Sequence, residues 1–187
     1  RHLLDMRFAL TKPLDEVPMK VHAAAGEATL QEALYRPLLE QLASRNFAPK
    51  SLRELMTALP TQPYVQLLQE LTVLIGMAAV APCQSENAAK QTQKRCAALN
   101  AHLMERAVSS ADIDTLASPV LGGGFPIARI MQLFLHARSQ GKKTAEEWAH
   151  HAWQILEGQN QRLLKDGKAV ESADANLAEL NRQATEF

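Results

Sequence analysis

The stretch SLRELMTALPTQPYVQLLQELTVLIGMAAVAP, residues 51–82, decides the fold that the sequence predicts. Ser51 and Glu54 stand three residues apart, the spacing of a capping box, in which each residue satisfies a free N–H at the start of a helix. Pro60 ends this first helix because proline cannot continue it without losing a backbone hydrogen bond. The quoted stretch therefore begins with a short helix of less than ten residues.

Pro63 begins a second helix, since proline suits a first helical turn. Gly76 ends this helix. MAAVAP, residues 77–82, is a small apolar run that predicts a strand. Within the helix, apolar residues recur at the i, i+3, i+4, i+7 spacing of an amphipathic face: Tyr64, Leu67, Leu68, Leu71, Leu74 and Ile75.

A further helix is predicted upstream, from Arg36 to about Arg45, with Pro37 in its first turn. Three short helices followed by a strand is the order of a winged helix. The connection PTQP between the last two helices is as short as a helix-turn-helix requires. We therefore predict a winged-helix-like unit over residues 28–84.

The N-terminal segment, residues 1–27, predicts a β-hairpin. Residues 3–10, LLDMRFAL, and 17–23, VPMKVHA, alternate between apolar and polar side chains, and the TKPLDE between them carries turn formers. Residues 26–30 either add a short third strand or lead into a helix. The chain begins with Arg rather than Met, so we expect a fragment whose hairpin is the end of a preceding domain.

Residues 85–187 predict a helical C-terminal domain. One helix runs from Ser85 to about Val108, a second begins at Pro126, a third at the Thr144–Glu147 capping box and a fourth at Ser172. Residues 109–125 read as irregular, and residues 165–168 as a turn. The predicted fold class is mainly α (α+β), with an N-terminal hairpin, a winged-helix-like unit and a C-terminal helical bundle.

The charge balance argues against nucleic-acid binding. Twenty Lys and Arg residues match twenty Asp and Glu residues, whereas affinity for the phosphate backbone needs a cationic excess. Residues 50–82 also sum to zero, with Lys50 and Arg53 against Glu54 and Glu70. The helix that would read bases has one charged residue, the acidic Glu70, and no Lys or Arg. Gln62, Gln66 and Gln69 nevertheless have the amide groups to contact base edges.

Other composition features suggest a cytoplasmic protein with no membrane partner. Cys83 and Cys96 lack the spacing of a zinc site and are expected to be reduced thiols. No apolar run reaches the length that spans a bilayer, and the N-terminus does not resemble a signal peptide.

The most suggestive candidate site is the loop Gly122, Gly123, Gly124 and Phe125, placed before the helix predicted at Pro126. Backbone N–H groups at a helix N-terminus can hold an anion. No Lys-Ser or Lys-Thr follows, so this is not a phosphate-binding Walker loop, and no GxGxxG is present. The loop is either an anion or interface site or, the favoured interpretation, a tight turn that lets helices pack closely.

Other reactive residues give no clear site. His150 and His151 are adjacent and point about 100° apart on a helix, unlike a metal-binding pair, although Glu147 lies one turn before His151. They are interpreted as a polar face. The aromatic residues Phe134, Trp148 and Trp153 suit a core better than a ligand pocket, and Ser109, Ser110 and Ser118 have no evident His partner. We predict no catalytic, metal or cofactor-binding residue.

Several stretches resemble the regulatory region that follows the catalytic domain in bacterial SAM-dependent methyltransferases, the predicted methyltransferase regulatory domain. The layout is similar to that of rickettsial-type protein lysine methyltransferases. The most specific stretch is LASPVLGGGFPIARIMQLFL, residues 116–135. The others are YRPLLEQLASRNFAPKSLRELMTAL at 35–59, LLQELTVLIGMAAVAP at 67–82, CAALNAHLMERA at 96–107 and EGQNQRLLKDGKAV at 157–170.

The resemblance implies a parent enzyme whose S-adenosylmethionine lies in a Rossmann-like domain that these residues do not contain. The chain itself would be a non-catalytic accessory region, without cofactor. It would pack on the catalytic domain in cis, recognise a protein substrate or form a homodimer. Two alternatives stay open: a winged-helix DNA-binding transcriptional regulator, and a small enzyme whose site is assembled in space.

Overall fold

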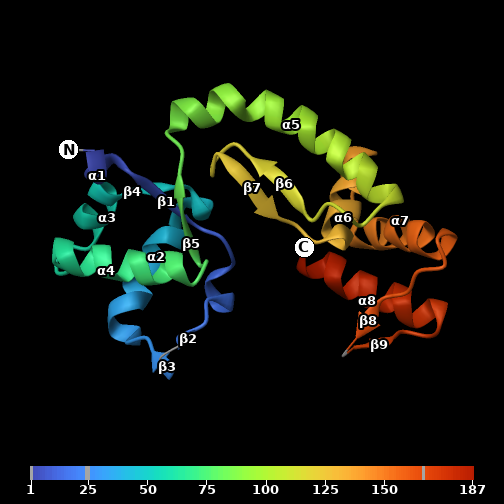
Figure 1. The fold of residues 1–187 in the computed structure, drawn as a ribbon, viewed down its shortest axis with the longest axis horizontal. Helices are drawn as coiled ribbons and strands as arrows, with labels where there is room; N and C mark the ends of the chain where they lie inside the picture. The colour runs from blue at the N-terminus through green and yellow to red at the C-terminus, as the bar shows by residue number, and fades with distance from the viewer. Residues whose placement is uncertain (1, 24–25, 166) are drawn as a thin grey trace. The chain divides into compact units, whose positions relative to one another are not determined.

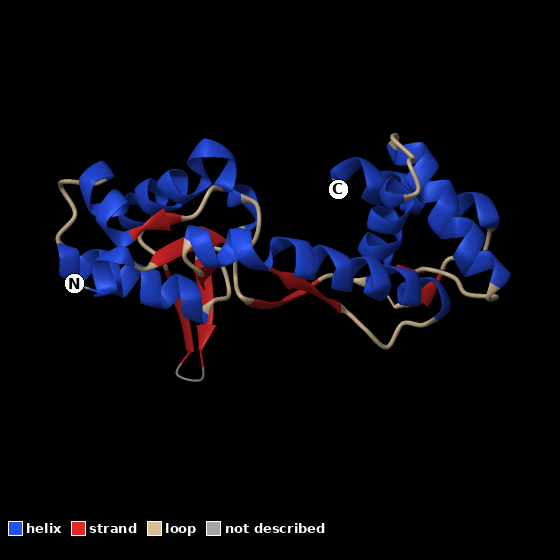
Figure 2. Cartoon of the chain, turned by 90° about the horizontal axis from the view of Figure 1, so that it is seen from above, coloured by secondary structure: helices blue, strands red, loops and turns tan. Residues whose placement is uncertain are grey.

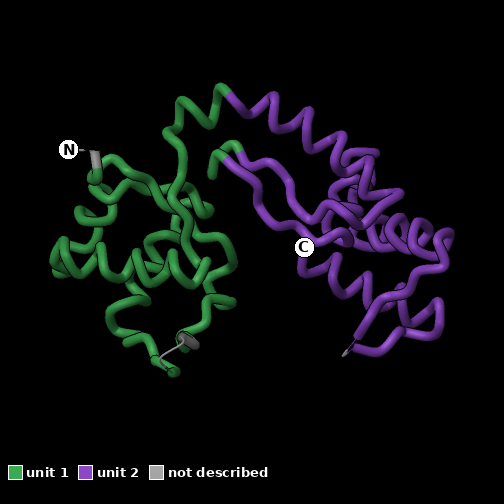
Figure 3. Tube along the Cα trace, in the orientation of Figure 1, with its two compact units in different colours: residues 1–91, 119–122 green, residues 92–118, 123–187 purple. Residues whose placement is uncertain are grey.

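The computed structural model describes residues 2–23, 26–165 and 167–187. The chain divides into two compact units, coloured separately in Figure 3. Unit 1 comprises Arg1–Gln91 with Pro119–Gly122, and unit 2 comprises Thr92–Ser118 with Gly123–Phe187. Residues 1–27 and 28–84, which the sequence pattern assigned to separate segments, both fall in unit 1. As predicted, the protein is mainly helical, with small antiparallel sheets.

Unit 1 mixes short helices and strands (Figure 1). In chain order these are α1 (His2–Asp5), β1 (Arg7–Leu10), the 3-10 helix η1 (Leu14–Glu16), β2 (Lys20–Ala23), β3 (Gly26–Thr29), α2 (Glu32–Phe47), β4 (Lys50–Ser51), α3 (Leu52–Ala58), α4 (Tyr64–Gly76) and β5 (Val80–Cys83). Helix α5 (Glu86–Ser109) begins in unit 1 and continues into unit 2.

Strand β1 is the central strand of a three-stranded antiparallel sheet with the order β4-β1-β5. Phe8 pairs with Lys50 on one side and with Pro82 on the other. The sequence predicted that residues 3–10 pair with residues 17–23, and this pairing is wrong. Phe8 and Ala9 are buried in unit 1. Their burial favours a central position for β1, between β4 and β5, over a hairpin with the segment that follows it in the chain.

An N-terminal hairpin is nevertheless present, made by β2 and β3 (Figure 2). Lys20 pairs with Thr29, and the residues of β3 are exposed. Figure 2 shows the two strands projecting from the helices of unit 1. The short third strand that residues 26–30 suggested is therefore β3, and its partner is the strand immediately before it.

The local signals for α3 and α4 act as predicted. The Ser51 hydroxyl accepts from Glu54 N–H, and the Glu54 carboxylate accepts from Ser51 N–H, which completes the capping box. Pro63 occupies the N-cap of α4. The buried residues of these two helices and of α2 form one core with β1 and β5: Leu38, Leu39, Leu42, Leu52, Leu55, Leu59, Leu67, Leu71, Leu74, Phe8 and Val80.

Unit 2 contains the rest of α5 and a second set of helices. They are α6 (Arg129–Ser139), α7 (Ala145–Gly158) and α8 (Ala173–Glu186), with the hairpin strands β6 (Thr115–Ser118) and β7 (Gly123–Pro126), and β8 (Leu164–Lys165) and β9 (Lys168–Ala169). The turn predicted at 165–168 includes Asp166, which lies outside the described residues.

Residues 109–125 are not simply irregular, because they contain β6 and the start of β7. Thr115 pairs with Pro126, and Leu116, which is buried, pairs with Phe125. Pro126 therefore ends a strand and does not begin a helix; α6 starts three residues later, at Arg129. The alternation signal was hidden because three of the strand positions are glycine or proline, residues depleted in strands.

Candidate functional site

The outward face of α4 is uncharged. Val65 is 62% exposed, and Gln69, Thr72 and Ile75, which are also exposed, follow it at i+4, i+7 and i+10 on the same face. The opposite face, with Leu67, Leu71 and Leu74, is buried in the core. Val65 and Ile75 are exposed on a helix whose inner stripe already fills the core, so they are available to contact another protein.

The two cations near α4 are both engaged elsewhere. Lys50 is 2% exposed, and its ammonium donates to the carbonyl oxygens of Leu42, Ser44 and Ala48 at 3.2, 2.7 and 3.0 Å. It thereby satisfies the free carbonyls at the end of α2. Arg53 pairs with Asp5 at 3.1 Å. Neither residue supplies a phosphate contact without breaking these interactions.

The glutamines that could have contacted bases are also partly used within unit 1. Gln62 donates its amide to Leu34 O at 2.8 Å, and Gln66 donates to Glu70 at 2.9 Å. Gln69 is exposed. The surface of α4 therefore offers little of the polar and cationic chemistry that DNA recognition uses.

Glu70, the charged residue of α4, is buried rather than displayed. It is 2% exposed, and its Oε2 has no hydrogen-bond partner among the described residues. Burial raises the pKa of this carboxyl and also, together with the nearby Glu70 charge, raises the pKa of Tyr35 on α2. The ionised Glu70 therefore destabilises the folded protein at neutral pH. Because its side chain is buried, the outer face of α4 carries no charge.

The glycine-rich stretch lies at a hairpin instead of a helix N-terminus. Gly122 adopts a positive φ of 73° in the turn, a conformation that favours glycine, and Gly123, Gly124 and Phe125 pair with Ser118, Ala117 and Leu116. Gly124 packs against the side chain of Thr115. The anion-binding geometry expected from a loop directly before a helix does not arise, because Ile127 and Ala128 separate this strand from α6.

Unit 2 contains a hydrogen-bonded chain of titratable groups that links three helices. Glu105 on α5 lies 3.2 Å from His136 Nε2, and His136 Nδ1 on α6 lies 2.9 Å from His151 Nε2 on α7. His136 is 8% exposed, whereas the Glu105 side chain is 71% exposed. The chain thus runs from a solvated carboxylate to a buried imidazole and on to a second imidazole.

The order of these groups suggests the direction of the hydrogen bonds. The Glu105 carboxylate can accept a hydrogen bond from His136 Nε2–H, and His136 Nδ1 can then accept one from His151 Nε2–H. Burial, and then the neighbouring His136 and Lys142, lower the pKa of His151. A carboxylate–imidazole–imidazole series of this kind can hold and pass a proton.

The sequence pattern did not reveal these three groups. It paired His151 with Glu147, but the Glu147 carboxylate instead accepts from the backbone N–H of Lys143 and Thr144 at the start of α7. The partners of His151 lie 15 and 46 positions upstream, on other helices, where no local spacing relates them. The spacing of the three residues matches neither a helical nor a strand repeat, so the sequence could not indicate that they meet.

Most of the remaining candidates are structural. Phe134 is fully buried, and Trp148 contacts Phe187 edge-on, whereas Trp153 lines a pocket. Ser110 donates to Asp112 and not to a histidine. Cys83 is a free thiol whose pKa burial raises to about 11, so it is a poor nucleophile.

Metal-binding and membrane-spanning features are both absent from the described residues. Within them, no set of three or more His, Cys, Asp or Glu side chains is placed to hold a metal. No helix in this part of the chain has both the length and the apolar character needed to cross a bilayer.

No family model and no solved structure matches the chain. It is similar to an uncharacterized protein of Synechocystis sp. (strain ATCC 27184 / PCC 6803 / Kazusa), with 32% identity over 185 residues. The match covers 98% of this chain and 35% of that relative, so the chain spans about a third of the length of the curated relative.

Proposed function

We propose that this chain is a non-catalytic accessory region of a SAM-dependent methyltransferase, and that it packs on the catalytic domain in cis. The observation that carries the proposal is the outward face of α4: Val65, Gln69, Thr72 and Ile75 form an uncharged surface, with two exposed apolar side chains, on a helix already anchored in a core. A cytoplasmic location and a protein substrate for the parent enzyme belong to the same proposal.

The topology of unit 1 supports this interpretation. Helix α2, strand β4, helices α3 and α4 and strand β5 follow one another in winged-helix order, against the sheet β4-β1-β5. In a DNA-binding winged helix the position of α4 would face the major groove and carry polar and basic residues. Here that position carries no basic residue, which favours docking on a protein.

The relative supports a role within a larger protein. About two thirds of its length lies outside the match, which is room for a separate catalytic domain. The resemblance of residues 116–135 to the methyltransferase regulatory region supplies the class of that domain. Its S-adenosylmethionine would bind there, and none would bind to the 187 residues of this chain.

Hydrogen–deuterium exchange tests the docking surface. We expect peptides of α4 to exchange more slowly in the full-length protein that carries this region than in the 187-residue chain. Val65→Glu with Thr72→Glu, both at exposed positions, should return the exchange of α4 in the full-length protein to that of the isolated chain. Leu164→Glu is the matched control, because Leu164 is 74% exposed but lies on β8.

Three outcomes would contradict the proposal. Tight binding of S-adenosylmethionine to the 187-residue chain in calorimetry would show that the cofactor site lies here. Salt-dependent binding to duplex DNA at low ionic strength would favour a transcriptional regulator. A dimer of the isolated chain that Val65→Glu dissociates would assign α4 to a homodimer interface.

A further inference from the structure

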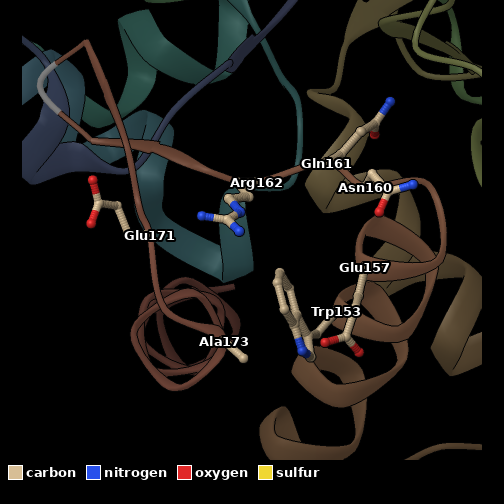
Figure 4. Close-up of a pocket in the computed structure, with 7 residues that line it drawn as sticks. All are labelled: Trp153, Glu157, Asn160, Gln161, Arg162, Glu171 and Ala173. Carbon is tan, nitrogen blue, oxygen red and sulfur yellow. The ribbon is translucent and has the colours of Figure 1, made fainter.

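A polar pocket of about 170 Å³ lies in unit 2, at the end of α7 and the start of α8 (Figure 4). Trp153 and Glu157 come from α7, Arg162 from the loop that follows, and Glu171 from the segment that leads into α8. In Figure 4 the Arg162 guanidinium lies between Glu171 and Trp153. The pocket thus combines a cation, two carboxylates and an aromatic face.

One wall of the pocket is held by Arg129, on α6. Its guanidinium donates to the carbonyl oxygens of Ala107 and Val108, and also to the side-chain oxygens of Gln161 and Gln159 at 2.5 and 2.8 Å. These bonds tie the loop after α7 to the end of α5. The loop therefore has a fixed conformation before any ligand arrives.

The other wall is held by Asn176, which is fully buried. Its Oδ1 accepts from Leu163 N–H at 2.8 Å, and its amide donates to the carbonyls of Val170 and Ser172 at 2.7 and 2.8 Å. Asn176 thereby links the chain on both sides of Arg162 and Glu171. Two polar side chains thus fix the backbone around the pocket.

The charged groups that face the pocket have no partner of their own. Among the described residues, Arg162, Glu157 and Glu171 make no side-chain hydrogen bond and no ion pair. Some other charges of unit 2 are paired, as between Arg182 and Glu179 at 2.7 Å. Charged groups of both signs at a pocket whose backbone is held in place can fix the orientation of a charged small molecule.

The two signs restrict the ligand. A purely anionic molecule would meet two carboxylates, and a purely cationic one would meet Arg162. We propose that the pocket binds a free α-amino acid as its zwitterion. The α-carboxylate pairs with Arg162, whose planar guanidinium suits a carboxylate. The α-ammonium lies near Glu157 and Glu171, and the ligand contacts the indole of Trp153, which also favours a cation at its face.

Isothermal calorimetry of the 187-residue protein with each of the twenty free amino acids tests this proposal. We expect at least one to bind. Its methyl ester, which keeps only the cation, and its N-acetyl derivative, which keeps only the anion, should each bind at least tenfold more weakly. Because both derivatives retain the side chain, the comparison isolates the two charges.

Variants assign the two ends of the ligand. Arg162→Gln should lower the affinity for the free amino acid at least tenfold and leave the affinity for the ester unchanged. Glu157→Gln combined with Glu171→Gln should also lower the affinity for the free amino acid at least tenfold. The affinity for the N-acetyl derivative should stay unchanged. Arg95→Gln and Glu146→Gln are controls, since both residues are exposed and lie outside the pocket.

The proposal is overturned if no amino acid binds at millimolar concentration. It is also overturned if the ester or the N-acetyl derivative binds as tightly as the zwitterion, or if Arg162→Gln leaves the affinity unaltered. The result does not depend on the proposed function, because calorimetry with amino acids requires neither a methyltransferase domain nor S-adenosylmethionine.

Discussion

His136 Nδ1 and His151 Nε2 lie 2.9 Å apart, within hydrogen-bond distance. Their rings are 5.1 Å apart between centroids and tilted by 33°. Glu105 contacts the other nitrogen of His136, while Lys142 adds a positive charge near His151. Burial, His136 and Lys142 lower the pKa of His151, so its imidazole binds a proton less readily than a free one.

Unit 2 should lose stability in mild acid. The pKa of His151 is lower in the folded protein than in the unfolded chain, so the unfolded chain binds the proton more readily as the pH falls below about 6.5. The free energy of unfolding begins to fall near this pH, and the loss is complete below the pKa of His151 in the folded protein. Urea unfolding at pH 7.5 and 5.5 measures the loss.

His151→Gln should make that stability difference smaller, because glutamine does not titrate. His150→Gln serves as the matched control, since His150 is exposed on the same helix and should leave the pH dependence as it is. An unchanged pH dependence in His151→Gln would contradict the assignment.

Lys50→Met should destabilise unit 1 by about 2–4 kcal/mol. The substitution removes three charge-assisted hydrogen bonds and leaves the carbonyls at the end of α2 without donors. Thermal and denaturant unfolding measure the loss. Lys90→Met, at an exposed i,i+4 ion pair with Glu86, should have a much smaller effect on stability, because solvent screens the pair. Equal effects of the two substitutions would show that Lys50 has no capping role.

Glu70→Gln should raise the free energy of unfolding at pH 7. Because burial raises the folded pKa of Glu70, its contribution to stability is most favourable in acid, below the unfolded pKa, and is lost as the pH rises through the folded value. Glutamine removes this loss. Denaturant titrations at pH 4.5 and 7 check the prediction, with the exposed Glu40→Gln on α2 as control. A lower stability of Glu70→Gln at pH 7 would contradict it.

Asn176→Ala should destabilise unit 2 by about 2–4 kcal/mol, since three buried hydrogen bonds are lost at once. It should also weaken amino-acid binding, because Arg162 and Glu171 would no longer be held on a fixed backbone. The exposed Asn87→Ala should change neither property. Full retention of stability in Asn176→Ala would argue that the loops are fixed by other contacts.

Where a signal is local, the sequence predicted the fold well. The capping boxes at Ser51 and Thr144 begin α3 and α7 as expected, and Ser172 caps α8 through Ala175 N–H. The predicted strand at 77–82 contains most of β5. These elements depend on neighbours within one or two turns, and such contacts leave a spacing that can be read directly.

Where a partner is distant, the prediction failed. The partners of β1 are more than 40 residues away, and nothing in RFAL distinguishes a central strand from one arm of a hairpin. The same holds for the site: Glu105, His136 and His151 meet only because α5, α6 and α7 pack together. The glycines at 122–124 suggested a loop since they suppress the alternation by which β7 could have been recognised.

The position of β1 also governs how unit 1 is assembled. Ala9 pairs with Ala81, so the sheet closes a loop of about seventy residues, and such a high contact order slows folding. During synthesis β1 leaves the ribosome well before β5, and until β5 arrives its N–H and C=O groups form an open edge that other chains can pair with. A truncated chain that begins after residue 27 would meet the opposite problem, because β4 and β5 would remain with no strand between them and would be prone to aggregate.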